Sequence, residues 1–200
     1  MEFTGVYMLK RSYYIINLIT MYRIAAAPVL VVLIITYQVV LFKWLLAVSF
    51  LTDAVDGYLA RKYKVTSRFG SRLDSIGDDL TIAAAIIGLF VIKPGFISSQ
   101  IILVSVLLIL FVLQNIFAYA RYRRQTSFHT YVAKAAAVLQ GFFMLSIFFL
   151  PHPFMILFYA AAGVTIIDLV EEIILISLLP KWQADVKGVY WVLRKKKRKH

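Results

Sequence analysis

The sequence has 200 residues, of which 62% are hydrophobic, and a mean hydropathy of +0.81. A soluble domain is usually about 45–50% apolar, so this composition excludes an ordinary soluble protein and predicts one polytopic membrane domain. Cysteine is absent, which excludes disulfides, thiolate metal sites and cysteine nucleophiles. The net charge of +12 could suggest a nucleic-acid partner. The positions of the basic residues favour anionic lipid instead, and no nucleic acid is expected.

Six segments are apolar enough and long enough, at about 20 residues, to cross a bilayer as helices. They are residues 18–38, 39–59, 74–93, 99–119, 133–150 and 154–179. Pro94-Gly95 and Pro151-His152-Pro153 mark two of the connections, because such residues stop helices. The predicted fold is therefore an all-α integral membrane protein with a six-helix core over residues 18–179.

The two ends of the chain are predicted to lie on the membrane surface. Residues 1–17 and 180–200 both combine aromatic side chains with Lys and Arg. This combination is typical of an interfacial anchor on anionic lipid. Residues 1–200 are thus read as a single domain, with an interfacial N-terminal segment, the core, and a basic interfacial tail. Membrane lipids are expected partners.

The basic residues also predict the orientation of the chain. Cytoplasmic loops of membrane proteins carry an excess of Lys and Arg. With six spans and both termini in the cytoplasm, every Lys and Arg except Lys43 and Lys93 falls on the cytoplasmic side. We therefore expect a multi-pass protein whose residues 53–79 lie at the cytoplasmic membrane surface.

Residues 53–79 hold half of the ten acidic residues of the chain. Acidic side chains beside membrane-spanning sequence are costly and usually functional. Residues three and four apart share a face of a helix. This spacing predicts two stripes, and the four carboxylates converge if residues 62–69 turn the chain back. The stripes are Asp53, Asp56, Gly57, Ala60 and Arg61, and Gly70, Asp74 and Asp78.

Such a cluster suits divalent cations and phosphate. Four adjacent carboxylates cannot all stay ionised without a cation between them, and oxygen ligands suit Mg²⁺, Mn²⁺ or Ca²⁺. Small residues let a phosphate approach the backbone, and the fork of Arg61 suits phosphate oxygens. The pattern indicates metal-assisted phosphoryl transfer on a diphosphate substrate. For any one aspartate, a structural salt bridge is the alternative.

The stretch resembles the signature of the CDP-alcohol phosphatidyltransferase family, D-x-x-D-G-x-x-A-R-(x)8-G-x-x-x-D-x-x-x-D, and fills every signature position. Upstream, Asn17, Thr20 and Arg23, followed by Pro28, are similar to the N-x-x-T-x-x-R…P pattern of the family's first helix. The resemblance implies an enzyme that transfers a phosphatidyl group from a CDP-lipid, usually CDP-diacylglycerol, to an acceptor alcohol and releases CMP. It also implies a homodimer.

The same resemblance implies a role for each signature residue. Asp53, Asp56 and Asp74 would bind two divalent ions, Mg²⁺ or Mn²⁺, while Asp78 would both contact metal and act as the general base. The CDP pocket would be formed by the remaining signature residues, Gly57, Ala60, Arg61 and Gly70. Asp79 stands where many members carry Lys, and its spacing predicts that it points away from the metal ligands.

The acceptor alcohol is left open by a departure from the family. Residues 133–140, AKAAAVLQ, resemble a G-K-x-K-T-x-x-Q pattern but lack its second Lys and its Thr. This region often helps to hold the acceptor's phosphate. Glycerol phosphate, serine, inositol, inositol phosphate and phosphatidylglycerol all remain candidates. The residues expected to bind an acceptor phosphate are Lys134, Arg121 and Arg124.

The last span contains a further acidic group, Asp168, Glu171 and Glu172. These acids could line the cavity of the site or pair with Arg23 or Lys134, and we expect a structural pairing.

Two other function classes use similar residues. An intramembrane prenyltransferase also pairs D-x-x-D and D-x-x-x-D motifs with Mg²⁺, but usually far apart in sequence. A divalent-cation transporter would distribute its acids across the depth of the membrane, and it leaves the glycines and Arg61 unexplained.

Overall fold

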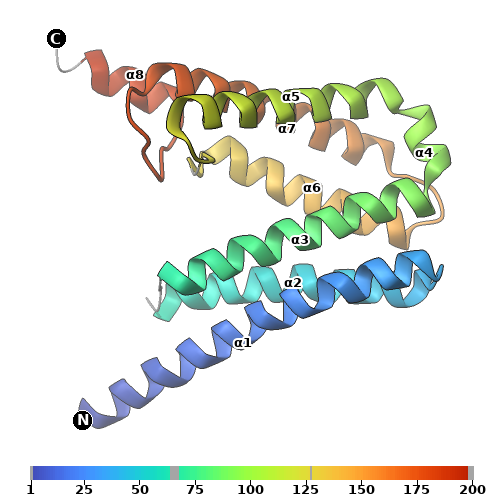
Figure 1. The fold of residues 1–200 in the computed structure, drawn as a ribbon, viewed down its shortest axis with the longest axis horizontal. Coiled ribbons are helices and arrows are strands. Elements are labelled where there is room, and N and C mark those ends of the chain that lie inside the picture. The colour runs from blue at the N-terminus through green and yellow to red at the C-terminus, as the bar shows by residue number, and fades with distance from the viewer. Residues whose placement is uncertain (1, 64–67, 127, 198–200) are drawn as a thin grey trace. The chain divides into compact units, whose positions relative to one another are not determined.

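The computed structural model describes residues 2–63, 68–126 and 128–197. Most of the described residues lie in helices, and no strand occurs among them. The predicted all-α fold is therefore confirmed. The helices form two compact units, Met1–Ile97 and Ser98–His200, and each unit is described by itself (Figure 1).

The first unit consists of three long helices, α1 (Glu2–Ile35), α2 (Val39–Tyr63) and α3 (Arg68–Ile92). Helix α1 packs against both α2 and α3, which also contact each other. The contact between α2 and α3 meets the condition under which the two acidic stripes can face each other. The core of this unit is formed by buried apolar side chains from all three helices, among them Leu30, Ile34, Phe42, Leu46, Ala84 and Ala85.

Helix α1 is longer than the predicted first span. Its 34 residues extend over about 51 Å at 1.5 Å per residue, whereas the hydrocarbon core of a bilayer is about 30 Å thick. The predicted N-terminal segment and first span are one continuous helix with Pro28 inside it. The turn into α2 covers only residues 36–38, and Tyr37 adopts a positive φ of 54° there.

The second unit is built around α7 (Met155–Leu178). This helix packs against α5 (Ile101–Tyr122), α6 (Tyr131–Phe149) and the short terminal helix α8 (Val189–Lys197). A one-turn helix, α4 (Pro94–Ser99), lies at the sequence boundary between the units. Pro94 occupies its first position, where a missing N–H costs nothing. Each predicted span overlaps one long helix, whereas α4 and α8 were not predicted as helices.

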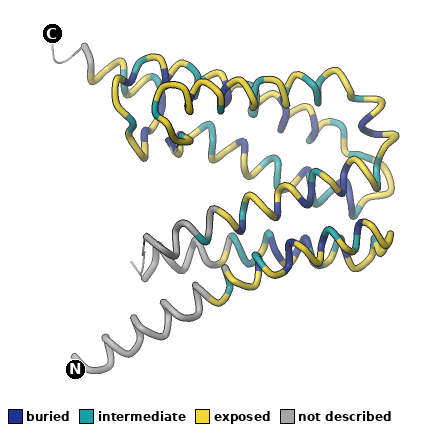
Figure 2. Tube along the Cα trace, viewed as in Figure 1, coloured by how far each residue is buried: buried dark blue, intermediate teal, exposed yellow. Residues whose placement is uncertain are grey.

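Two helices of the described chain, α5 and α6, are long and apolar enough to cross a membrane, and Met21–Ile35 is a shorter apolar segment. Large apolar side chains are exposed along both units (Figure 2). On α5, Ile102, Ile109 and Ile116 are exposed at seven-residue intervals and so share a face. Extensive exposed apolar surface of this kind marks contact with lipid or with another protein, and it indicates a membrane protein.

Candidate functional site

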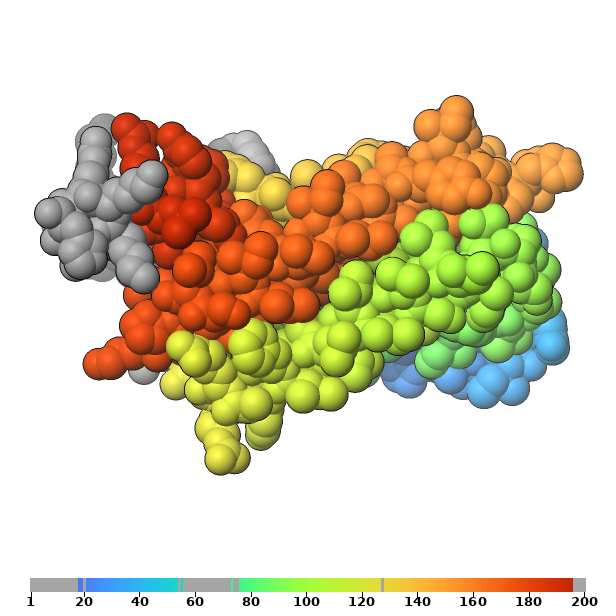
Figure 3. Space-filling view, turned by 90° about the horizontal axis from the view of Figure 1, so that it is seen from above, coloured from blue at the N-terminus to red at the C-terminus, as the bar shows by residue number. Residues whose placement is uncertain are grey.

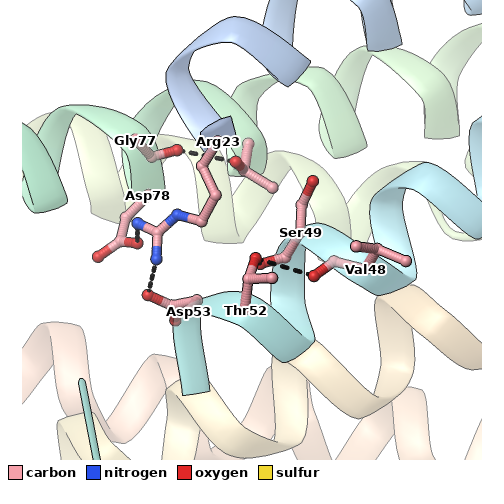
Figure 4. A network of polar contacts seen from close by, with 8 residues as sticks. Arg23, Val48, Ser49, Thr52, Asp53, Gly77 and Asp78 are labelled. Carbon is pink, nitrogen blue, oxygen red and sulfur yellow. Dashed lines mark hydrogen bonds and ion pairs between the residues drawn. The ribbon is translucent and has the colours of Figure 1, made fainter. Parts of the chain in front are cut away.

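A buried arginine connects the two helices that carry the acidic signature. Arg23 of α1 is 1% exposed. Among the buried residues that the structure describes, it is the only charged one. Its Nη1 donates to Oδ1 of Asp53 on α2, and its Nη2 donates to Oδ1 of Asp78 on α3 (Figure 4). One guanidinium therefore holds a carboxylate from each half of the signature.

The two carboxylates are open to solvent although their shared cation is not. The side chains of Asp53 and Asp78 are 44% and 39% exposed. The guanidinium thus lies on the protein side of the pair, and the carboxylates lie at the surface of the unit. Both carboxylates are therefore partly accessible at the surface of the described unit.

A glycine makes room for the guanidinium. A Cβ on Gly77, the residue before Asp78, would lie 3.1 Å from Nη2 and 3.4 Å from Nε of Arg23. Contacts this short are tighter than those of most real Cβ atoms, so a larger residue would displace the fork. The next turn of α3 is tied to this point, because Thr81 Oγ1 donates to the carbonyl oxygen of Gly77 at 2.8 Å.

The hydroxyl groups next to Asp53 are satisfied within α2. Ser49 is buried and donates to the carbonyl of Leu45 at 2.9 Å. Thr52 donates at 2.9 Å to the carbonyls of Val48 and Ser49. Such bonds to the preceding turn are common for Ser and Thr in helices. They direct these hydroxyls along α2.

The structure brings together Asp53 and Asp78 of the predicted metal ligands. The other signature residues lie on the predicted helices, but their side chains fall outside the described part of the structure. They are Asp56, Gly57, Ala60 and Arg61 on α2, and Gly70 and Asp74 on α3. Asp79 is exposed on α3, and its predicted direction away from the ligands stays a prediction.

The donor set fits a hard divalent cation. Asp53 and Asp78 come from different helices and already converge on one positive group. Their ligand atoms are carboxylate oxygens, which Mg²⁺ and Mn²⁺ prefer. Among the described side chains, no group of three or more His, Cys, Asp or Glu could hold a metal. The two aspartates that would complete the predicted set, Asp56 and Asp74, are not among those side chains.

The candidate acceptor-binding residues contact different parts of the second unit. Arg121 Nε donates to the carbonyl of Leu179 at 3.5 Å, and the guanidinium of Arg124 lies 4.6 Å from the ring centroid of Trp182. Lys134 Nζ lies 5.9 Å from the ring centroid of Tyr131. Within the described part of this unit, no recorded contact joins Lys134 to either arginine. Their predicted common pocket stays a prediction.

Two of the three acids of α7, Glu171 and Glu172, have other partners than those suggested by the sequence. Glu172 Oε2 accepts hydrogen bonds from Gln114 Nε2 and from Thr126 Oγ1. Glu171 Oε1 accepts from the backbone N–H of Val189 at 3.0 Å. These bonds connect α7 to α5, to the α5–α6 loop and to the start of α8. The predicted structural role is supported, but the hydrogen bonds come from neutral groups.

The role of Arg23 was missed by sequence reasoning, although a signal for it was present. An arginine inside an apolar helix requires an acidic partner, because an unpaired buried charge is very costly. Arg23, the arginine of the N-x-x-T-x-x-R pattern, lies in such a helix. Its choice of Asp53 and Asp78 over the acids of α7 depends on helix packing, which spacing along one helix does not reveal.

Residues 13–167 fit the family model described as CDP-alcohol phosphatidyltransferase. The chain belongs to the CDP-alcohol phosphatidyltransferase family. The matched region contains Arg23, Asp53 and Asp78, so the ion-pair network lies within the family's shared domain. No solved structure matches the chain.

Several curated relatives within this family carry the name CDP-diacylglycerol--glycerol-3-phosphate 3-phosphatidyltransferase. The chain is 39% identical over 77 residues to that of Rickettsia bellii, a match covering 36% of this chain and 41% of the relative. It is 34% identical over 74 residues to that of Pectobacterium atrosepticum, with the same two coverages, 36% and 41%. With that of Haemophilus influenzae, it shares 53% identity over 36 residues, or 18% of this chain and 20% of the relative. The matches thus span less than half of these relatives.

Proposed function

We propose that this protein transfers a phosphatidyl group from CDP-diacylglycerol to an acceptor alcohol and releases CMP. The observation that carries the proposal is the meeting of Asp53 and Asp78, from the two halves of the family signature, on one buried guanidinium at an open surface. Family membership supports the same reaction and favours it over prenyl transfer or cation transport.

The acceptor that we propose is glycerol 3-phosphate. The support is the name shared by the relatives, which specifies this acceptor. Its phosphate would be bound by the basic side chains at the α5–α6 connection, for which the candidates are Arg121, Arg124 and Lys134. Lys134 occupies the position of the first Lys in the G-K-x-K-T-x-x-Q pattern, whereas Ala136 and Ala137 replace the second Lys and the Thr.

The aspartates would hold the ions and move the proton. Asp53, Asp56, Asp74 and Asp78 would bind two divalent ions, Mg²⁺ or Mn²⁺, which when bound neutralise the diphosphate of the CDP-lipid. Asp78 would also accept the proton of the acceptor hydroxyl. The hydroxyl oxygen then forms a bond to the β-phosphorus, and the bond from this phosphorus to the CMP oxygen breaks. The nucleotide would be held by the small residues and the fork of the signature, Gly57, Ala60, Arg61 and Gly70.

We further propose the membrane arrangement of this reaction. The chain would cross the bilayer six times, with both termini and the acidic stretch at the cytoplasmic face, where a soluble nucleotide and an embedded lipid can meet. Residues 1–17, as the N-terminal continuation of α1, and residues 180–200 would reach the interface and contact membrane lipids. Small residues such as those at 83–85 and 135–137 permit close helix packing and support a homodimer.

The proposal is tested with the purified protein in lipid nanodiscs. CDP-diacylglycerol and Mg²⁺ or Mn²⁺ are supplied with each candidate acceptor, and CMP release is measured. We expect CMP with glycerol 3-phosphate, and a loss of about 10²–10⁴-fold in Asp78→Asn, the usual contribution of a general base. Asp79→Asn, the adjacent exposed carboxylate, serves as the matched control and should retain activity. Full activity of Asp78→Asn would refute the role of Asp78, and no CMP with any acceptor would refute the reaction.

A further inference from the structure

The arginine that joins the two signature helices has no part in the reaction as proposed above. We propose that Arg23 is a positioning residue of the divalent-cation site, whose guanidinium holds the carboxylates of Asp53 and Asp78 in the arrangement that the ions require. This inference rests on the proposed function only in assigning these two aspartates to the ions.

The hydrogen-bond geometry favours positioning over simple neutralisation. Nη1 and Nη2 of one planar fork each donate to a different carboxylate, and those carboxylates belong to α2 and α3 (Figure 4). The donors of a guanidinium have fixed relative directions. The fork therefore fixes the spacing of the two carboxylates in addition to neutralising their charge. The compact ammonium of a lysine would neutralise charge without fixing this spacing.

The burial of the three groups favours the same role. Arg23 is 1% exposed, whereas Asp53 and Asp78 are 44% and 39% exposed. A fixed cation lies on the protein side, and the carboxylates that it orients lie at the surface, where ions arrive. Buried partners that orient the ligands of a metal site typically change metal affinity by about 10–100-fold when they are removed.

A substitution at Gly77 tests the same contact in a second way. A Cβ at this position would lie 3.1 Å from Nη2, so an alanine would shift the fork by a few tenths of an ångström while every charged group of the network is retained. The variant therefore separates the position of the guanidinium from its charge.

Three roles for Arg23 predict different changes in metal affinity. If the arginine positions the ligands, its loss weakens metal binding. If it only competes with metal for the carboxylates, the loss of one positive charge tightens metal binding, because like charges repel. If it only stabilises the fold, the folded variants bind metal as the wild type does.

The experiment measures Mn²⁺ binding to the full chain in nanodiscs by the paramagnetic resonance signal of unbound Mn²⁺. The variants are Arg23→Lys, Arg23→Gln and Gly77→Ala. The control is Thr52→Val, next to Asp53, whose hydroxyl bonds only its own helix in the described structure. We expect Kd to rise at least about tenfold in both Arg23 variants, to rise less in Gly77→Ala, and to stay unchanged in Thr52→Val. Circular dichroism and size-exclusion chromatography check that each variant is folded.

Tighter or unchanged Mn²⁺ binding in folded Arg23→Gln would overturn the inference, as would no Mn²⁺ binding by the wild type. If both Arg23 variants fail to fold, Gly77→Ala decides, and an unchanged Kd there would also overturn it. CMP release is measured in parallel. Wild-type protein that binds Mn²⁺ but releases no CMP contradicts the proposed function alone. Wild-type activity with Arg23 variants that bind Mn²⁺ normally contradicts this inference alone.

Discussion

Single residues of α3 show how closely the first unit is packed. Gly77 and Gly88 both lie on this helix, and a Cβ on either would meet a side chain from another helix. At Gly77 that side chain is Arg23, and at Gly88 it is the ring of Phe42, whose exposure is 0%. The absence of a side chain at these two positions lets α3 approach the guanidinium of α1 and the aromatic ring of α2.

We expect Gly88→Ala to destabilise the protein by about 1–3 kcal/mol, the usual cost of overpacking a core. The added Cβ would lie 2.6 Å from Cζ of Phe42, and a buried ring cannot move aside. The measurement is thermal unfolding in detergent. Phe42→Leu should restore part of the loss when it is combined with Gly88→Ala. The control is Gly163→Ala on α7, where a Cβ would meet nothing within 4 Å, and equal destabilisation by both alanines would contradict the packing argument.

From the sequence, only the local geometry of the candidate site could be predicted, and the structure joins one residue of each predicted stripe through Arg23. Asp53 and Asp78 were assigned to facing stripes because the helical repeat is the same in every helix. Arg23 was considered as a partner for the acids of α7, because sequence spacing carries no information about which helices pack together. Its contact with Asp53 and Asp78 follows from the packing of α1 on both α2 and α3.

At the scale of elements, the last part of the described chain is attached to the loop between α5 and α6, which is predicted to be cytoplasmic. The attached part, residues 180–197, is called the C-terminal segment. Trp182 Nε1 donates to the carbonyl of Gln125 at 3.0 Å, and the carbonyl of Lys187 accepts from the backbone N–H of Tyr131 at 3.4 Å. Val186 is buried in a cluster with Phe128 and residues from the ends of α5 and α7. Figure 3 shows the surface of α8 lying against that of α7.

Glu171 fixes the point where α8 begins. Its carboxylate accepts the N–H of Val189, the first residue of α8. A carboxylate at a helix N-terminus satisfies an otherwise unpaired donor and interacts favourably with the helix dipole. The preceding Gly188 has a φ of 144°, and a Cβ there would lie 2.9 Å from Glu171 Oε1. The start of α8 therefore depends on both Glu171 and Gly188.

We expect Glu171→Ala and Gly188→Ala to release the C-terminal segment without unfolding the rest of the second unit. The first variant removes the acceptor of the Val189 N–H, and the second forces a side chain into a backbone conformation that favours glycine. The measurement is amide hydrogen exchange, which should become faster over residues 186–193 in both variants. Ser177→Ala on α7, whose hydroxyl bonds only Ile173 of the same helix in the described structure, is the control. Unchanged exchange in Glu171→Ala would contradict the attachment.

The limits of sequence reasoning at this scale are visible in the same segment. The mixture of aromatic and basic residues predicted an interfacial tail, but not that residues 189–197 form a helix attached to Glu171. The glycine before the helix is a recognisable start signal. The acid that caps it lies 18 residues away in the sequence, on another helix, and only the tertiary structure identifies it.

At the scale of the whole molecule, helix length and composition give fewer membrane crossings than the distribution of basic residues does. By length and apolar composition, α5 and α6 qualify within the described residues. Helices α2, α3 and α7 carry acidic residues of the signature or of the last span. The distribution of basic residues favours six crossings, because Lys43 and Lys93 are the exceptions to a cytoplasmic assignment of every Lys and Arg.

Six crossings and two crossings predict different labelling of single cysteines. The chain contains no native cysteine, so Gln38→Cys, Gln125→Cys, His152→Cys and Gln183→Cys each provide one thiol at an exposed position. With six spans, a membrane-impermeant maleimide labels positions 38 and 152 on intact cells, and labels 125 and 183 only after permeabilisation. If only α5 and α6 crossed the bilayer, positions 38, 152 and 183 would lie on one side and 125 on the other, and the hydrogen bond from Trp182 to Gln125 would be lost. Position 183 is therefore decisive. Its labelling together with 152 would refute six crossings, and its protection together with 125 would place the end of the chain on the side of the basic α5–α6 connection.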